Sequence, residues 1–268
     1  MFPWPASREI AERVDRLELT WNQHGYDPYG ISKRELARMF TALALLYRHY
    51  FTVTVHGLEH VPPRGRAMLV GNHSGGVAFD GMMVLASVFL GLEPPRLAQG
   101  MAEKFLNRLP FASLLTSRTG HFTGLPEHAV RLLEDERLLM VFPEGARGTA
   151  KLFKDRNSLI EFGTGFLRLA LQTSTPIVPL AFVGGGEAFP TIANLYRLGE
   201  IVGVPYLPVT AYLLPLPLPV RVQILYGEPL RFPGRGNEED EVIACWVDEV
   251  KRRIAALIDR GVRGKART

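Results

Sequence analysis

The sequence has almost no cysteine, no long helix-compatible apolar run and no concentrated basic tract. Cys245 is the only cysteine, so no disulfide can form within the chain, which fits a reducing compartment. No Lys/Arg tract with interleaved aromatic residues occurs, which argues against nucleic acid as a partner. Residues 1–20 are charged and lack an apolar centre, so we expect no secretory signal peptide.

The longest uncharged stretch, residues 201–220, matches the length needed to cross a bilayer. It contains five prolines, each of which would disrupt helical hydrogen bonding, so an irregular apolar surface or loop is favoured over a membrane span. The apolar segment 81–91 is too short to span and is predicted to be a buried helix. The net charge of +4 suits an anionic partner such as a membrane surface or a phosphorylated small molecule.

Two helices are predicted near the N-terminus. Residues 7–22 have a helical pattern, and a second helix begins at Ser32, which is spaced from Glu35 as in a capping box. Its apolar side chains recur at three- and four-residue spacing: Leu36, Met39, Phe40, Leu43, Tyr47 and Tyr50. Two interpretations remain open. The helix packs on its own domain, or it also lies on a membrane with its arginines (Arg34, Arg38 and Arg48) toward lipid phosphates.

From residue 52 onward, short apolar runs alternate with helical patterns. The predicted strands are 51–55, 66–72, 137–143, 176–183 and 220–227. The predicted helices are 81–90, 101–109, 127–136, 163–172 and 241–258. This alternation predicts an α/β fold, with a mostly parallel central sheet flanked by helices and preceded by the N-terminal helical pair. We therefore divide the chain into a helical segment, 1–51, and a main domain, 52–268.

The segment "GNHSGG", residues 71–76, follows the apolar run 67–70 at the end of a predicted strand, where open α/β sheets place their sites. His73 can act there as a general base, because an unperturbed imidazole accepts a proton near neutral pH. Gly75 and Gly76 allow close approach of a ligand and leave N–H groups for a developing oxyanion. Asp80 is a candidate to orient the imidazole. The alternative is a purely structural, hydrogen-bonded histidine.

A second polar segment, "FPEGARG", follows the predicted strand 137–143. Glu144 and Arg147 are three residues apart on a turn bracketed by glycines, so both side chains are expected to converge on one ligand. A guanidinium suits a phosphate, and a carboxylate can hold a hydroxyl. The alternative is a solvent-exposed Glu–Arg pair. Lys151 and Lys154 follow, either as contacts for the phosphates of coenzyme A or, more simply, as part of a solvated basic face.

Together the two segments resemble the glycerolipid and lysophospholipid acyltransferase superfamily, of the PlsC-like type. The resemblance rests on Asn72-His73 followed by Asp80, on Phe142 to Arg147, and on the run "TPIVPLAFVG" at 175–184. It implies transfer of an acyl group from acyl-CoA or acyl carrier protein to a lipid hydroxyl, as in phospholipid biosynthesis. His73 would be the base and Asp80 its partner, and acceptor or donor would contact Asn72, Ser74, Gly75, Gly76, Arg118, Glu144, Gly145 and Arg147.

The same resemblance implies no metal, no resident cofactor and no covalent acyl-enzyme. The thioester would be a co-substrate, and membrane lipids would be partners. The helices of residues 1–51 would dock the protein on the cytoplasmic side of a membrane, as a peripheral or monotopic protein.

The chain departs from the family pattern at two places. Six residues separate His73 from Asp80 instead of the usual four, and a continuous helix would place the two about 10.5 Å apart along its axis. We therefore predict that the two glycines loop back. In residues 119–128, Gly124 and Leu125 replace an Asp-Arg pair that binds acceptor phosphate, with Arg118 as a possible substitute. This disfavours a lysophosphatidate acceptor and favours a neutral or different one, such as a diacylglycerol, another long-chain alcohol or a lyso-lipid. The form "GNHSGG" also resembles the diacylglycerol-acyltransferase-like branch.

Two other functions compete with acyl transfer. One is a lipid hydrolase that uses Ser74 beside His73, although no Gly-x-Ser-x-Gly elbow occurs. The other is a non-catalytic lipid-binding protein of the same fold, which the presence of His73 and Glu144 disfavours. His121, in the segment between the two motifs, is a weaker candidate for a substrate contact.

Overall fold

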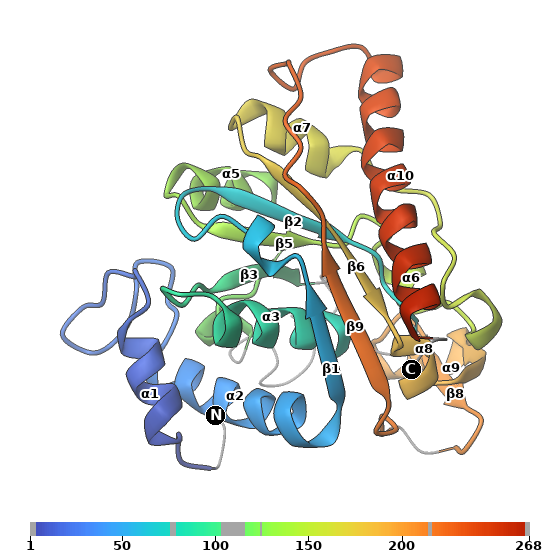
Figure 1. The fold of residues 1–268 in the computed structure, drawn as a ribbon, viewed down its shortest axis with the longest axis horizontal. Coiled ribbons are helices and arrows are strands. Elements are labelled where there is room, and N and C mark those ends of the chain that lie inside the picture. The colour runs from blue at the N-terminus through green and yellow to red at the C-terminus, as the bar shows by residue number, and fades with distance from the viewer. Residues whose placement is uncertain (1–3, 76–78, 103–115, 124, 214–215, 266–268) are drawn as a thin grey trace.

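The computed structural model describes residues 4–75, 79–102, 116–123, 125–213 and 216–265. Within these residues a seven-stranded sheet forms the centre of the molecule, in the order β1-β9-β6-β2-β5-β3-β4 (Figure 1). Its strands are β1 (Thr52–His56), β2 (Ala67–Gly71), β3 (Ala98–Ala102), β4 (Phe122–Thr123), β5 (Leu138–Val141), β6 (Ile177–Val183) and β9 (Arg221–Tyr226). Neighbouring strands run parallel, except for β6 and β9, which are antiparallel. The predicted α/β fold with a mostly parallel sheet is confirmed.

Helices cover both faces of the sheet. One face carries α1 (Arg8–Asp15), α2 (Lys33–Leu45) and α3 (Phe79–Gly91), and the other carries α5 (Pro126–Glu134), α7 (Gly165–Gln172) and α10 (Asp240–Lys265). Alternation along β2 explains the two layers, because Leu69 packs toward α3 while Met68 and Val70 pack toward α7 and α10. Both sets are fully buried, as expected for a parallel sheet covered on both faces.

Short elements connect these layers. They are η1 (Leu46–Tyr50), η2 (Leu58–His60), α6 (Ala146–Thr149), η4 (Phe153–Asp155) and α8 (Gly185–Ala188). All five predicted strands and the helices predicted at 81–90, 127–136, 163–172 and 241–258 are present, with shifted ends. Most of the predicted helix 101–109 lies outside the described residues, and residues 101–102 belong to β3. Strands β3 and β4 were not predicted.

The N-terminal helices pack on the sheet domain. The first helix ends at Asp15 rather than continuing to residue 22, and in the second the Ser32 hydroxyl accepts from the Glu35 N–H, as the capping pattern predicts. Of the apolar stripe, Leu36, Met39, Phe40 and Leu43 are buried, and the Phe40 ring stacks on Phe89 of α3 at 3.8 Å. The packing of α2 on its own domain is therefore observed, and these side chains are not available to a membrane.

The arginines beside that stripe also have protein partners. Arg48 forms two hydrogen bonds with the Glu9 carboxylate, and Arg38 pairs with Glu35. The Arg48–Glu9 pair therefore joins η1 to α1, and the Arg38–Glu35 pair joins successive turns of α2.

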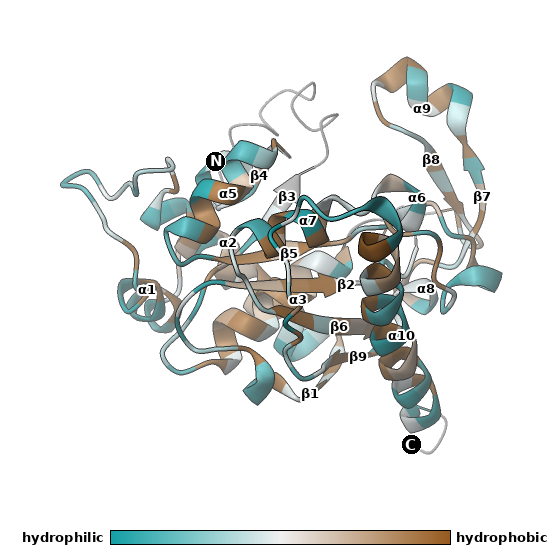
Figure 2. Ribbon diagram, turned by 90° about the horizontal axis from the view of Figure 1, so that it is seen from above, coloured by the Kyte–Doolittle hydropathy of each residue, from teal (hydrophilic) through white to brown (hydrophobic). Residues whose placement is uncertain are grey.

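The proline-containing stretch 201–220 forms part of an excursion from the sheet. After α8 the chain forms β7 (Thr191–Leu195), α9 (Tyr196–Val202) and β8 (Leu207–Thr210), and β7 and β8 pair antiparallel as a separate two-stranded sheet. We call residues 191–213 the apolar arm; Figure 2 shows β7, α9 and β8 standing out from the body of the molecule. None of the helices in the described part of the chain is both long enough and apolar enough to cross a bilayer.

Candidate active site

The two polar segments meet at one edge of the sheet. Strands β2 and β5 are parallel neighbours, with Val70 opposite Val141, so the residues that follow them emerge side by side. The imidazole of His73 stacks on the ring of Phe142, with 4.2 Å between ring centroids. The register of the strands thus builds the site from segments seventy residues apart.

His73 and Asp80 are in direct contact. The imidazole Nδ1 lies 3.0 Å from Asp80 Oδ2, and both side chains are buried. Asp80 lies in the first turn of α3, where its carboxylate also accepts from the N–H groups of Ser74 and Gly81. The chain turns between them at Gly75, whose φ of +94° is in the left-handed region that favours glycine. The pair is therefore in contact despite the longer spacing, with Gly75 in a turn conformation; Gly76 lies outside the described residues.

This pairing fixes which nitrogen of a neutral imidazole carries the lone pair. A carboxylate only accepts hydrogen bonds, so Nδ1 of a neutral His73 carries the proton and Nε2 carries the lone pair. No described residue forms a hydrogen bond with Nε2. The geometry is that of a general base held in one tautomer by an acidic partner.

Beneath the His73 loop lies a buried ion pair. The Lys151 ammonium lies 2.7 Å from both carboxylate oxygens of Glu144 and donates to the main-chain carbonyl of His73 at 2.7 Å. Glu144 also accepts from the N–H groups of His73 and Ile160, at 2.9 and 3.0 Å. Burial lowers the pKa of Lys151 below its usual value, which the charge of Glu144 opposes.

Glu144 and Arg147 do not converge on a common ligand. The carboxylate of Glu144 is only 1% exposed and is occupied by protein donors, whereas Arg147 is exposed and donates to the carbonyl of Glu161 at 3.5 Å. The structure therefore gives the two side chains different environments: Glu144 is buried with Lys151, and Arg147, in α6, is exposed. Lys151 is buried and paired with Glu144, so it does not lie on a solvated basic face, and the sequence analysis missed this pair.

Asn72 and Ser74 flank His73 but face protein. The Asn72 amide group donates to the Phe182 carbonyl at 3.1 Å and accepts from the Phe182 N–H at 2.9 Å, so it joins the end of β2 to β6. The Ser74 hydroxyl is buried against α8 and has no hydrogen-bond partner among the described residues. A methyl group at Gly185 would come within 1.7 Å of it. The sequence analysis expected both residues to contact substrate. In the structure, Asn72 contacts Phe182 of β6 and Ser74 contacts α8.

Arg118 lies against the N-terminal segment rather than beside His73. Its guanidinium donates to the carbonyl of Gly30 at 3.1 Å and lies 4.6 Å from the centre of the Tyr26 ring. His121 packs beside Gly100 of β3, where burial lowers its pKa to about 4 and keeps it neutral. Lys154 is exposed, and Gly124 lies outside the described residues.

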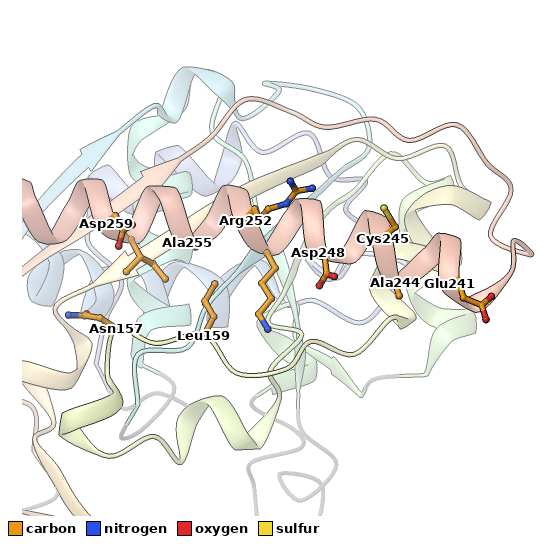
Figure 3. Close-up of a pocket in the computed structure, with 11 residues that line it drawn as sticks. Asn157, Leu159, Glu241, Ala244, Cys245, Asp248, Arg252, Ala255 and Asp259 are labelled. Carbon is orange, nitrogen blue, oxygen red and sulfur yellow. The ribbon is translucent and has the colours of Figure 1, made fainter.

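A groove of about 870 Å³ runs along α10, away from these residues (Figure 3). Its lining carries charges of both signs, among them Asp248, Lys251 and Arg252, and includes none of the predicted site residues. No cluster of three or more metal-binding side chains (His, Cys, Asp or Glu) occurs in the part of the chain that the structure describes.

Comparisons with known proteins identify the family. Residues 52–183 match the family model named Acyltransferase. An uncharacterised protein of Mycobacterium tuberculosis is 35% identical over 257 residues, covering 91% of this chain and 70% of the relative. A human protein named "DGAT1/2-independent enzyme synthesizing storage lipids" is 25% identical, covering 95% and 74%.

Among solved structures, the fold is similar to that of the 1-acyl-sn-glycerophosphate (LPA) acyltransferase PlsC from Thermotoga maritima. The TM-score is 0.57 and the identity 18%, covering 83% of this chain and 79% of that chain. The matched family region contains both polar segments, from His73 to Lys151. The chain therefore belongs to the acyltransferase family and is an O-acyltransferase.

Proposed function

We propose that the protein transfers a fatty acyl group from an acyl thioester to the hydroxyl of a glycerolipid, lysophospholipid or similar lipid, with His73 as general base. The observation that carries this proposal is the His73–Asp80 pair, with Nδ1 held at 3.0 Å and Nε2 left for a substrate proton. The donor is acyl-CoA or acyl carrier protein. The thioester is a co-substrate, and the chemistry needs neither a metal nor a resident cofactor.

The reaction is a single displacement through a tetrahedral intermediate. The acceptor oxygen attacks the thioester carbonyl carbon as His73 Nε2 takes the hydroxyl proton. The carbon–sulfur bond then breaks, and the imidazolium returns its proton to the departing thiolate. Asp80 stabilises the imidazolium. We assign stabilisation of the developing oxyanion to the N–H of Gly75, which follows His73 and Ser74 in the left-handed conformation.

A neutral acceptor, such as a diacylglycerol or another long-chain alcohol, fits the chain best. The acceptor-phosphate arginine of the family pattern is replaced by Leu125, and Arg118 is engaged with Gly30 and Tyr26. The printed name of the human relative, an enzyme of storage-lipid synthesis, supports the same choice. The site of action would be the cytoplasmic face of a membrane, in glycerolipid or phospholipid synthesis.

An acyl-transfer assay tests the proposal. Purified protein, radiolabelled acyl-CoA or acyl carrier protein and a panel of lipid alcohols in mixed micelles are compared with the His73→Ala variant. We expect label in a neutral acceptor, and a loss of at least about a thousandfold in His73→Ala with the fold retained by circular dichroism. Turnover retained in this variant would remove His73 as the base. Binding of lipid without turnover, with either donor, would indicate a lipid-binding protein.

The hydrolase alternative has its own test. Because the Ser74 hydroxyl is buried against α8, Ser74→Ala should keep most of the transferase activity. Release of label only as free fatty acid, together with complete loss of activity in a folded Ser74→Ala variant, would establish a serine hydrolase instead.

A further inference from the structure

The apolar arm exposes an unusual number of large hydrophobic side chains. Ile201 is 79% exposed, Leu213 78%, Ile192 58% and Val202 53%. The other exposed large hydrophobic residues of the arm are Leu195, Tyr196, Leu198 and Leu207. Single apolar residues on a surface are common in soluble proteins. Eight large ones within residues 191–213 are instead typical of a surface that binds a partner or a membrane.

Charge is nearly absent from the same segment. Residues 191–213 contain only Arg197 and Glu200 as charged residues. Tyr196 begins α9 and Tyr206 follows its end, with 6.1 Å between their ring centroids. Tyrosine is enriched where protein meets the boundary between lipid headgroups and acyl chains, because its ring is apolar and its hydroxyl is polar. The composition of the arm therefore matches a lipid interface.

The arm begins beside the candidate active site. The side-chain amide of Asn194 in β7 donates to the Ala150 carbonyl at 2.6 Å, and Ala150 directly precedes Lys151 beneath His73. The preceding helix α8 packs on Ser74 through Gly185. A surface that held the arm would thus hold the His73 loop close to it.

Exposed apolar residues continue beyond the arm onto the end of α2 and η1. The Tyr50 hydroxyl donates to the Pro217 carbonyl at 2.6 Å, which joins η1 to the segment after the arm. Leu45 is 59% exposed, Tyr50 40% and Leu216 63%. Exposed apolar side chains therefore also occur at the end of the N-terminal helices, although the main stripe of α2 is buried.

We propose that the apolar arm, residues 191–213, inserts into the interfacial region of a lipid bilayer and presents the His73 site to substrate in the membrane. This rests on the proposed function, which places both acyl chain and acceptor in lipid. An amphipathic surface of this kind embeds about 5–10 Å into the boundary between headgroups and acyl chains.

Vesicle flotation without any acyl donor tests the surface independently of catalysis. The full chain is mixed with phosphatidylcholine vesicles and compared with the triple variant Leu198→Asn/Ile201→Asn/Val202→Asn. The control is Val242→Asn/Val262→Asn, which replaces exposed apolar residues of α10. We expect partition to fall at least about tenfold in the arm variant and to stay unchanged in the control. Equal binding by the arm variant, or failure of the wild type to float, overturns the proposal.

Single tryptophan substitutions locate the inserted residues and do not depend on the folding of the triple variant. With brominated phosphatidylcholine, Ile201→Trp should show a blue shift and quenching beyond the native tryptophan background, whereas Val242→Trp should not. Absence of quenching at Ile201→Trp overturns insertion. If the wild type is instead a dimer in solution and the triple variant a monomer, the arm is an interface between copies and the proposal also fails.

Turnover measurements distinguish a failure of membrane insertion by the arm from a failure of the proposed acyl-transfer function. The triple variant should retain turnover of a soluble short-chain thioester and alcohol, while turnover of acceptor in vesicles falls about as much as partition. An enzyme inactive with every substrate but still bound through the arm would contradict the proposed function alone.

Discussion

The ammonium of Lys151 donates to the main-chain carbonyl of His73 over 2.7 Å while pairing with Glu144. Glu144 accepts from the His73 N–H, so both polar groups of the His73 backbone are held by one buried ion pair. The backbone of Lys151 also lies under the loop, since its carbonyl would be 2.8 Å from a methyl group at Gly75. Lys151 and Glu144 thus position the backbone of His73, the proposed general base.

Replacing Lys151 should destabilise the fold and the site together. Lys151→Met leaves the Glu144 carboxylate buried without its cation, which costs about 3–5 kcal/mol in the free energy of unfolding by urea. In the double variant Lys151→Met/Glu144→Gln the unpaired charge is gone, and we expect at least about 1 kcal/mol to be recovered. Under conditions where the single variant is folded, kcat should fall more than KM rises. A loss of stability below about 1 kcal/mol would contradict the pairing.

Asp80→Asn should preserve the fold but impair catalysis. An amide group facing Nδ1 stabilises the wrong tautomer and no longer supports an imidazolium, so we expect kcat to fall by about a hundredfold to ten-thousandfold. Asparagine can still accept from the N–H of Gly81, which limits the change in structure. Steady-state kinetics and circular dichroism measure the two effects. Near-normal kcat in the folded variant would leave Asp80 with only a structural role.

Gly148→Ala should disturb His73 and Glu144 at once. A methyl group there would lie 2.7 Å from the Glu144 carboxylate and 2.9 Å from His73 Cβ, so we expect a loss of about 1–3 kcal/mol in unfolding free energy and most of the activity. Gly165→Ala is the matched control, because nothing lies within 4 Å of its added methyl group at the start of α7. It should keep full activity and gain up to about 1 kcal/mol. Equal activity in both variants would show that the contact is unimportant.

Arg118→Ala should affect stability rather than acceptor binding. The variant loses a hydrogen bond to Gly30 and the contact with the Tyr26 ring, together worth about 1–2 kcal/mol. Urea unfolding and acceptor KM are measured side by side. A several-fold rise in KM with unchanged stability would instead identify Arg118 as an acceptor ligand.

Local sequence patterns were sufficient to predict the fold class and the order of its main strands and helices. Apolar runs such as 67–71 and 177–183 are buried on both sides in any parallel sheet, so their composition identifies them without knowledge of their neighbours. Strands β3 and β4 escaped prediction because polar or small residues interrupt them, as Gln99 and Gly100 do in β3. Strand β3 pairs with β5, and β4 pairs with β3, and the local sequence reveals neither pairing.

The sequence by itself determined that His73, Asp80 and Glu144 follow strands that end at one sheet edge, since strand ends and glycine turns are local properties. Only the tertiary structure decided what each side chain contacts there. Lys151 and Glu144 form a buried ion pair because a buried ammonium or carboxylate is strongly destabilising unless an opposite charge lies beside it. The apolar stripe of α2 is buried because it packs against the sheet domain. The large apolar side chains of the arm stay exposed because the described part of the sheet domain does not cover them.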